Sequence, residues 1–242
     1  MTADRSAAPP RVPWWIFVLF AGALVAQLLS IAWRPAEHRF PAALPPPPPA
    51  PVLRVLALGD PHFLSAAIVL HLQSFDDQPG LSIPFRELDY GRIAAWLDRA
   101  LALDPLSDYP LLLAAQVYAQ APDAGRQRVM LDFVHRAFLD DPDRRWRWLA
   151  HAAIVARHRL RDDALALRYA QDIAEHARAA PGWAKQMHIF LLEDLGEREQ
   201  AKILLGGLLA SGAISDPAEI RFLTGRLDEL NGRFSSPKNP TR

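Results

Sequence analysis

The side chains best suited to charged contacts lie at residues 144–148, where the sequence RRWRW alternates arginine and tryptophan. In a helix, with about 100° per residue, several basic side chains from this region fall on one face. Arginines there can bind the carboxylates of a partner, and aromatic neighbours add stacking. The alternative is a solvated face with ion pairs to nearby aspartates. Our candidate partner-binding residues are Arg144, Arg147, His151 and His158.

No pattern typical of catalysis or metal binding accompanies them. His151 and His158 are seven residues apart, whereas a metal-binding pair on a helix is usually three or four apart. A Gly-rich phosphate loop and a Gly-x-Ser-x-Gly turn are both missing from the sequence. The aspartates at 140, 141 and 143 precede a helix, where they are expected to cap free N–H groups. We therefore predict no enzymatic activity, no cofactor and no metal site.

The composition of the chain excludes further classes of protein and of binding site. The chain has 242 residues, half of them hydrophobic, with 27 basic and 27 acidic residues. Zero formal net charge argues against nucleic-acid binding through bulk charge. The absence of cysteine excludes disulfides, zinc–thiolate sites, iron–sulfur clusters and a cysteine nucleophile.

An uncharged apolar segment runs from Trp14 to Trp33. Twenty residues at about 1.5 Å each cover about 30 Å, the thickness of the hydrocarbon core of a bilayer. Tryptophans at both ends suit the membrane interface. A buried core helix or a cleaved signal peptide are the alternatives. We predict a transmembrane helix at residues 13–34.

The orientation of this helix in the membrane is predicted from the flanking charges, which are nearly balanced, since two arginines precede the segment and two follow it. We expect residues 1–12 to form a short cytoplasmic tail. The predicted protein is then a single-pass protein of the bacterial inner membrane with its C-terminal domain in the periplasm.

Small residues recur every fourth position within this segment, at Gly22, Ala26 and Ser30. Such a stripe lets two helices approach closely in lipid, so a homodimer is one expectation. The alternative is the ordinary small-residue content of membrane helices.

Residues 35–52 form a Pro-rich linker that contains five consecutive prolines, Pro45 to Pro49. Proline fixes φ near −65° and has no N–H, which favours extended polyproline II. A stiff stalk of about 50 Å is expected, at about 3.1 Å per residue. A docking peptide for a polyproline-binding domain is the alternative.

The rest of the chain is predicted to be helical, because no stretch shows the period-2 alternation of strands. Asp60-Pro61 is expected to open the first helix. Prolines at positions 105, 142, 181 and 217 lie 37, 39 and 36 residues apart, a near-constant period typical of an α-solenoid. The expected helices are 61–75, 89–104, 108–120, 124–140, 143–158, 161–178, 182–195, 197–211 and 216–230.

Two segments, Ala100-LALD-Pro105 and Ala137-FLDD-Pro142, carry a small residue five positions before a proline. In this the sequence resembles the tetratricopeptide repeat family, in which that pattern ends the second helix of each repeat. Leu195-Gly196 is similar to the family's interhelix turn. The resemblance implies buried packing residues in the helices, at Leu111, Ala115, Tyr118, Trp148, Ala152, Val155, Ala201 and Leu205. Trp96, Trp148 and Trp183 are expected in the core.

These observations predict an all-α chain with a repeat domain of about four helical hairpins at residues 55–232 and a flexible tail at 233–242. The resemblance implies a scaffold that binds other proteins of the cell envelope and no nucleic acid. A peptide-binding or chaperone-like assembly factor is the alternative function, and a hydrolase is a third.

Overall fold

A computed structural model describes residues 13–32, 43–75, 77–78 and 81–232. The chain divides into two compact units, Met1–Ala42 and Ala43–Arg242, which are described separately. The predicted tails at 1–12 and 233–242 lie outside the described residues, as does the part of the predicted linker at 35–42.

The first unit contains one described helix, α1 (Trp14–Ala32). Its side chains from Phe17 to Ser30 are exposed and mostly apolar. Among the described residues, no single helix meets the length and hydropathy expected of a membrane span, and the apolar part of α1, Trp14–Ser30, falls short in length. Space around Gly22 is open, and the Ser30 hydroxyl donates to the Gln27 carbonyl at 2.8 Å. The predicted pairing of two such helices stays a prediction.

The second unit is all-α apart from a two-residue antiparallel ladder, β1 (Asp77–Gln78) with β2 (Leu81–Ser82). Short 3-10 and π turns complete it: η1 (Phe85–Glu87), η2 (Leu113–Val117) and η3 (Tyr118–Gln120). Its α-helices are α2 (Ala50–Leu56), α3 (Pro61–Phe75), α4 (Tyr90–Leu103), α5 (Tyr109–Leu112), α6 (Ala124–Asp140), α7 (Pro142–His158), α8 (Asp163–His176), α9 (Gly182–Lys185), α10 (Met187–Asp194), α11 (Arg198–Ala210) and α12 (Pro217–Leu230).

Aspartates cap several of these helices, because a carboxylate accepts hydrogen bonds from backbone N–H groups that have no partner within the helix. At the start of α7 the expected cap is not formed, since Asp141 makes no such bond and Asp143 accepts from Ala179 N at 2.8 Å. The Asp60 carboxylate accepts from Phe63 N at 2.9 Å, as the Asp60-Pro61 pair predicts. The same cap recurs at the start of α4, α6, α8 and α12, where the accepting residues are Asp89, Asp123, Asp162 and Asp216.

The predicted helices match the observed ones closely, with two local differences. Residues 108–120 are not one regular helix, since α5 passes into the π turn η2 and then the 3-10 turn η3. The predicted helix 182–195 is broken at Gln186 into α9 and α10. Gly196 has φ of +86°, a backbone conformation that glycine adopts easily, and it ends the turn expected there.

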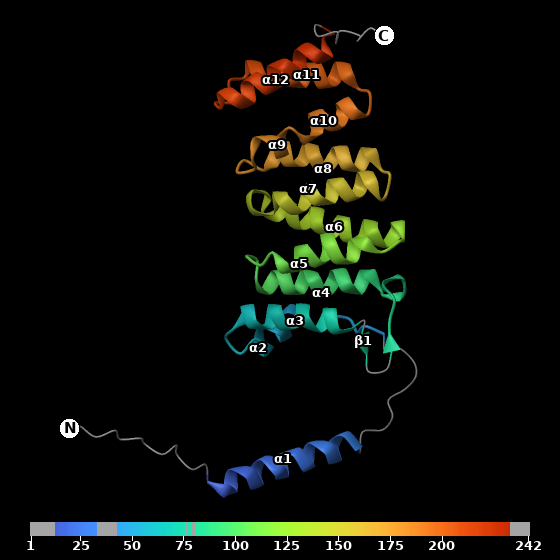
Figure 1. Ribbon diagram of the computed structural model, residues 1–242, viewed down its shortest axis with the longest axis vertical. Coiled ribbons are helices and arrows are strands. Elements are labelled where there is room, and N and C mark those ends of the chain that lie inside the picture. The colour runs from blue at the N-terminus through green and yellow to red at the C-terminus, as the bar shows by residue number, and fades with distance from the viewer. Residues whose placement is uncertain (1–12, 33–42, 76, 79–80, 233–242) are drawn as a thin grey trace, which may run out of the picture. The chain divides into compact units, whose positions relative to one another are not determined.

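Consecutive helices pack in pairs along the second unit (Figure 1). α3 packs on α4, α6 on α7, α7 on α8, α10 on α11, and α11 on α12. Contacts of α4 with α6 and of α8 with α10 link neighbouring pairs. Each pair therefore buries one face within itself and another against the next pair.

The core consists of two clusters of buried residues. The larger one extends from Leu44 to Ala184, and a smaller one joins α10, α11 and α12 around Leu205 and Leu223. All eight packing residues implied by the repeat resemblance are buried, as are Ala100 and Ala137. Trp96 and Trp148 are buried as expected, but Trp183 is 57% exposed, so the expectation that it lies in the core is wrong.

The beginning of this unit differs from the expected stalk. Leu44 is buried, its carbonyl accepts a hydrogen bond from Arg92, and the Pro45 carbonyl accepts from the Trp96 indole at 2.8 Å. Because proline has no N–H, only its carbonyl can form such bonds, and α4 supplies the donors. The chain then forms α2, a helix that the proline content of its surroundings did not indicate.

Candidate functional site

The four candidate residues lie on α7 but do not form one uniform surface. Arg144 and Arg147 are about half exposed, and His158 is exposed. His151 is partly buried, and its Nε2 atom is inaccessible and has no hydrogen-bond partner. The structure thus brings Arg144 and Arg147 together on the surface and places His151 further in.

Burial lowers the pKa of His151 below its ordinary value, whereas a hydrogen bond with the Ala115 backbone raises it. The nearby Arg159 guanidinium also lowers it, because two positive charges repel. At neutral pH the imidazole is therefore uncharged. This side chain lies beside η2 and contributes no positive charge to the surface.

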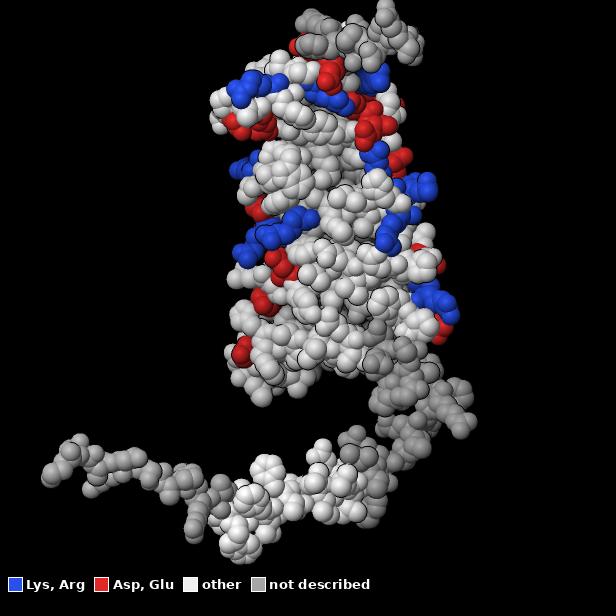
Figure 2. Space-filling model, viewed as in Figure 1, with Lys and Arg blue, Asp and Glu red and all other residues white. Residues whose placement is uncertain are grey.

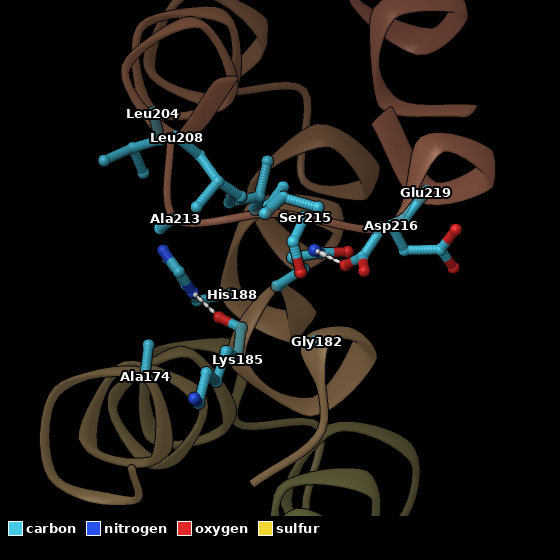
Figure 3. A pocket seen from close by; sticks show the side chains of 13 residues that line it. Ala174, Gly182, Lys185, His188, Leu204, Leu208, Ala213, Ser215, Asp216 and Glu219 are labelled. Atoms are coloured by element: carbon cyan, nitrogen blue, oxygen red, sulfur yellow. Dashed lines mark hydrogen bonds between the residues drawn. The ribbon is translucent and has the colours of Figure 1, made fainter. Parts of the chain in front are cut away.

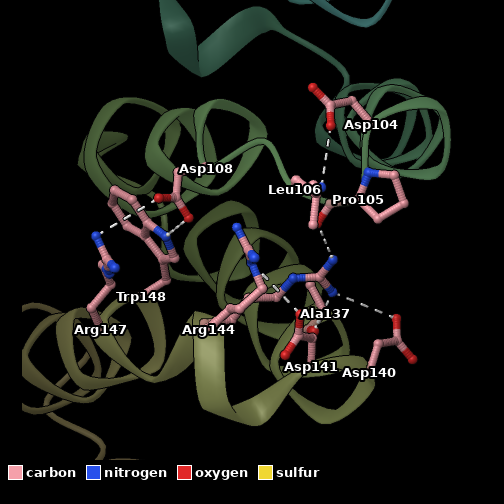
Figure 4. A network of polar contacts seen from close by, with 11 residues as sticks. Asp104, Pro105, Leu106, Asp108, Ala137, Asp140, Asp141, Arg144, Arg147 and Trp148 are labelled. Carbon is pink, nitrogen blue, oxygen red and sulfur yellow. Dashed lines mark hydrogen bonds and ion pairs between the residues drawn. The ribbon is translucent and has the colours of Figure 1, made fainter. Parts of the chain in front are cut away.

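Both exposed arginines pair with aspartates of the molecule itself (Figure 4). Arg144 Nε lies 3.8 Å from Asp141 Oδ2, within the first turn of α7. Arg147 lies 3.7 Å from Asp108 Oδ2, just before α5. These distances are long for charge-assisted hydrogen bonds, which are usually 2.7–2.9 Å. Exposed pairs of this kind contribute little to stability, so Asp141 and Asp108 hold the two guanidinium groups only weakly.

Asp108 also fixes a tryptophan. The Trp148 indole N–H donates to Asp108 Oδ1 at 3.0 Å while the ring is buried in the core. One carboxylate therefore holds both a core side chain and the surface guanidinium of Arg147. This arrangement sets the position of Arg147 relative to the end of α5.

Arg145 has a different role from its neighbours and was not among the predicted residues. It is 5% exposed, and its guanidinium donates to the Ala137 carbonyl at 2.6 Å and to the Pro105 carbonyl at 3.0 Å (Figure 4). Asp140 lies 4.0 Å away. Arg145 thus joins the end of α6 and the turn after α4 to the start of α7. The sequence gives one indication of this difference: neighbouring residues of a helix point 100° apart, so Arg145 cannot share the face of Arg144.

A pocket of about 450 Å³ lies among α9, α10, α11 and the turn before α12 (Figure 3). Its apolar wall comes from side chains of α10 and α11 and the turn that follows, namely Ile189, Leu204, Leu208, Ala213 and Ile214. Its polar side chains are Lys185, Gln186, His188, Ser215, Asp216 and Glu219. The lining is therefore mixed, whereas a typical site for a small molecule is mostly apolar with few polar groups.

His188 of α10 faces this pocket and is oriented by the last residue of α9. Its Nδ1 lies 2.8 Å from the Lys185 carbonyl, to which it donates in the neutral form. Burial is the largest influence and lowers the pKa of His188. The other ring nitrogen is then an acceptor. The sequence did not indicate this pocket, because the residues that line it are spread between positions 174 and 219.

Gly182 brings α12 close to the start of α9. A Cβ atom at this position would overlap the Glu219 carboxylate, which accepts a hydrogen bond from the buried Gln186 side chain. Beside it, the exposed Trp183 ring packs edge-on against Trp146, with ring centres 5.5 Å apart. A larger residue at position 182 would therefore have to displace the end of the Glu219 side chain.

Within the ranges that the structure describes, no group of three or more His, Asp or Glu side chains is arranged to hold a metal ion. Comparisons with protein-family models, with curated proteins and with solved structures return no match.

Proposed function

We propose that this chain is a membrane-anchored scaffold for protein–protein interactions, built on repeats similar to tetratricopeptide repeats. The observation that carries the proposal is the series of packed helix pairs, whose buried positions coincide with those that the repeat pattern requires. Helix pairs in such proteins stack into extended surfaces that bind other proteins.

The proposed binding surface is centred on α7. Arg144 and Arg147 are exposed and held by weak pairs, so that an acidic segment of a partner can displace Asp141 and Asp108. His158 extends this surface at the end of the helix, whereas His151 is partly buried.

We propose α1 as the membrane anchor because residues 13–34 are almost entirely apolar. Its exposed apolar side chains have no charged residue among them. We place it in the bacterial inner membrane, with the repeat domain in the periplasm. Pairing through Gly22, Ala26 and Ser30 would make the scaffold a dimer.

A second candidate function is peptide binding, as in a chaperone-like assembly factor. The pocket of about 450 Å³ favours it, since an apolar wall with polar side chains at its edge suits one or two side chains of an extended peptide. A scaffold binds a fixed set of folded proteins, whereas a chaperone binds many unfolded ones.

Affinity capture with the double variant R144Q/R147Q tests the proposed surface. Glutamine removes the positive charge without placing a new carboxylate beside Asp108 and Asp141. Exposed substitutions usually change the free energy of unfolding by less than about 0.5 kcal/mol, so the domain should remain folded.

The matched control is R198Q, which neutralises an exposed arginine on α11. We expect the double variant to lose partners that the wild type and R198Q retain from detergent-solubilised membranes. Equal capture by all three chains would contradict the proposed surface. Unfolding of the double variant would show that the arginines are structural.

A further inference from the structure

The first helical hairpin of the second unit, α2 with α3, exposes an unusual amount of apolar surface. Six large side chains on it are exposed: Val52 (46%), Val55 (75%), Leu56 (55%), Leu58 (92%), Phe63 (70%) and Leu70 (66%). Single exposed apolar residues are ordinary in proteins, but a group within 19 residues of sequence is not.

The two large apolar residues exposed on α3, Phe63 and Leu70, lie on one side of the helix, and the polar residues His62, His71, Gln73 and Ser74 are exposed as well. Phe63 and Leu70 are seven residues apart, which is two turns along the same face. The opposite face, with Ile68, Val69 and Leu72, is buried toward α4. α3 therefore carries large apolar side chains on the side that packs in the core and also on the side that faces outward.

Charge is sparse at this end of the unit, where Asp60 in the turn is an exposed carboxylate that caps α3. α3 contains no Asp, Glu, Lys or Arg, and Arg54 is the one charged residue of α2. At the other end, α12 contains Glu219, Arg221, Arg226, Asp228 and Glu229. Figure 2 shows the contrast on one face, with charged residues over the later helices and an almost uncharged surface at the α2–α3 end. Terminal repeats of stacked helix pairs usually need a polar outer face for solubility. α12 carries charged residues beside its exposed Ile220 and Phe222, whereas α3 carries none.

The turn between the two helices increases the exposure. Leu58 has φ of +48°, a region that large side chains rarely adopt, and it is followed by Gly59 with φ of +91°. A turn in water usually has asparagine or glycine at such a position. Here the turn instead projects a leucine outward.

A bilayer surface is the occupant that fits these observations. Taken together, α2 and α3 are long and apolar enough for a membrane segment, but a bend of 109° separates the two helices. A bent pair with one face packed on protein suits immersion in the interface between headgroups and acyl chains, about 5–10 Å deep.

Chain length supports the same occupant. Residues 33–42 join α1 to Ala43, and ten extended residues reach at most about 33–36 Å. An α1 embedded in a bilayer therefore keeps Ala43 within that reach of it. No such chain connection holds a protein partner or a second copy of the chain near α2 and α3.

We propose that the apolar face of the α2–α3 hairpin lies in the interface of the bilayer that holds α1, so that the repeat domain is attached to the membrane at two places. This inference rests on the membrane anchor of the proposed function. It makes the hairpin a lipid-binding surface and leaves the later helices free for proteins.

Spin labels on the full chain in vesicles of phosphatidylethanolamine and phosphatidylglycerol test it. The chain has no cysteine, so L58C and L70C each carry one label. The control is I203C on α11, whose parent side chain is 73% exposed. Collision with oxygen reports lipid, and collision with a water-soluble nickel chelate reports water. Far-UV circular dichroism verifies that each variant is folded.

We expect the labels at positions 58 and 70 to show a ratio of oxygen to nickel collisions several-fold above that at position 203. Equal ratios at all three positions would overturn the inference. Labels at 58 and 70 shielded from both reagents would also overturn it, since a protein would then cover the face.

Alkaline carbonate extraction of the same vesicles separates this inference from the anchor. Retention of the chain with water-exposed labels at 58 and 70 would refute the inference alone. Release of the chain would overturn the anchor, and this inference with it.

Discussion

At the scale of single residues, neighbouring arginines of α7 have opposite roles because each helical step turns the side chain by 100°. Arg144 and Arg147 lie on the surface, while Arg145 between them is buried against two carbonyl groups. The sequence predicted the exposed face from this periodicity. It could not show that carbonyls of Ala137 and Pro105 face Arg145, because these come from other elements.

Arg145 should be more important for stability than either exposed arginine. R145A removes the charged donor from the carbonyls of Ala137 and Pro105 and leaves the first of them buried without it, and we expect a loss of about 2–4 kcal/mol in the free energy of unfolding. R144A should cost less than about 0.5 kcal/mol. Urea unfolding of both variants measures the difference, and similar costs would contradict the assigned roles.

Two buried histidines make stability depend on pH. Burial lowers the pKa values of His151 and His188 in the folded state, so below the ordinary value of 6.5 the unfolded chain binds more protons than the folded one. Stability is therefore greatest above that pH and falls as the pH decreases through 6.5 toward the folded-state values.

The double variant H151Q/H188Q should lose less stability than the wild type between neutral pH and about pH 5, because the two groups that gain protons on unfolding are removed. Denaturant unfolding at several pH values tests this. The same acid slope in both chains would show that other groups determine it.

At the scale of elements, the sequence predicted the order of the helices well, because their ends carry local signals. Asp60-Pro61 and Asp216-Pro217 begin helices where expected, and Gly196 ends one. Helix α2 and the break at Gln186 were missed. Their causes are tertiary, since Leu44 and Leu53 become buried and Gln186 bonds to Glu219 of another helix.

The approach of α12 to α9 depends on Gly182. G182A should displace the Glu219 carboxylate and break its hydrogen bond with Gln186, with a loss of about 1 kcal/mol in the free energy of unfolding.

In an E219A background the same substitution should instead be neutral, or stabilising by up to about 1 kcal/mol, since alanine favours a helix over glycine. A double-mutant cycle measures this reversal. An equal effect of G182A in both backgrounds would mean that Glu219 is not the neighbour that requires glycine.

At the scale of the whole molecule, we propose that the helix pairs present an α7-centred surface to protein partners and that α1 holds the chain at a membrane. Composition and periodicity were sufficient to predict an all-α chain, while the packing residues came from the resemblance to the tetratricopeptide repeat family, and the expectation for Trp183 was wrong. Composition and periodicity could not predict the pocket, whose lining comes from residues 174–219, or the apolar outer face of α2 and α3. Both depend on which sides of the helices remain uncovered after packing.

Site-specific photo-crosslinking in intact membranes tests the central claim most directly. Benzoylphenylalanine replaces Arg147 in one chain and Arg198 in the control chain, and crosslinked proteins are identified by mass spectrometry. The scaffold account predicts a small, reproducible set of folded proteins crosslinked from position 147 and missing from position 198. Identical products from both positions, or none above background, would contradict it.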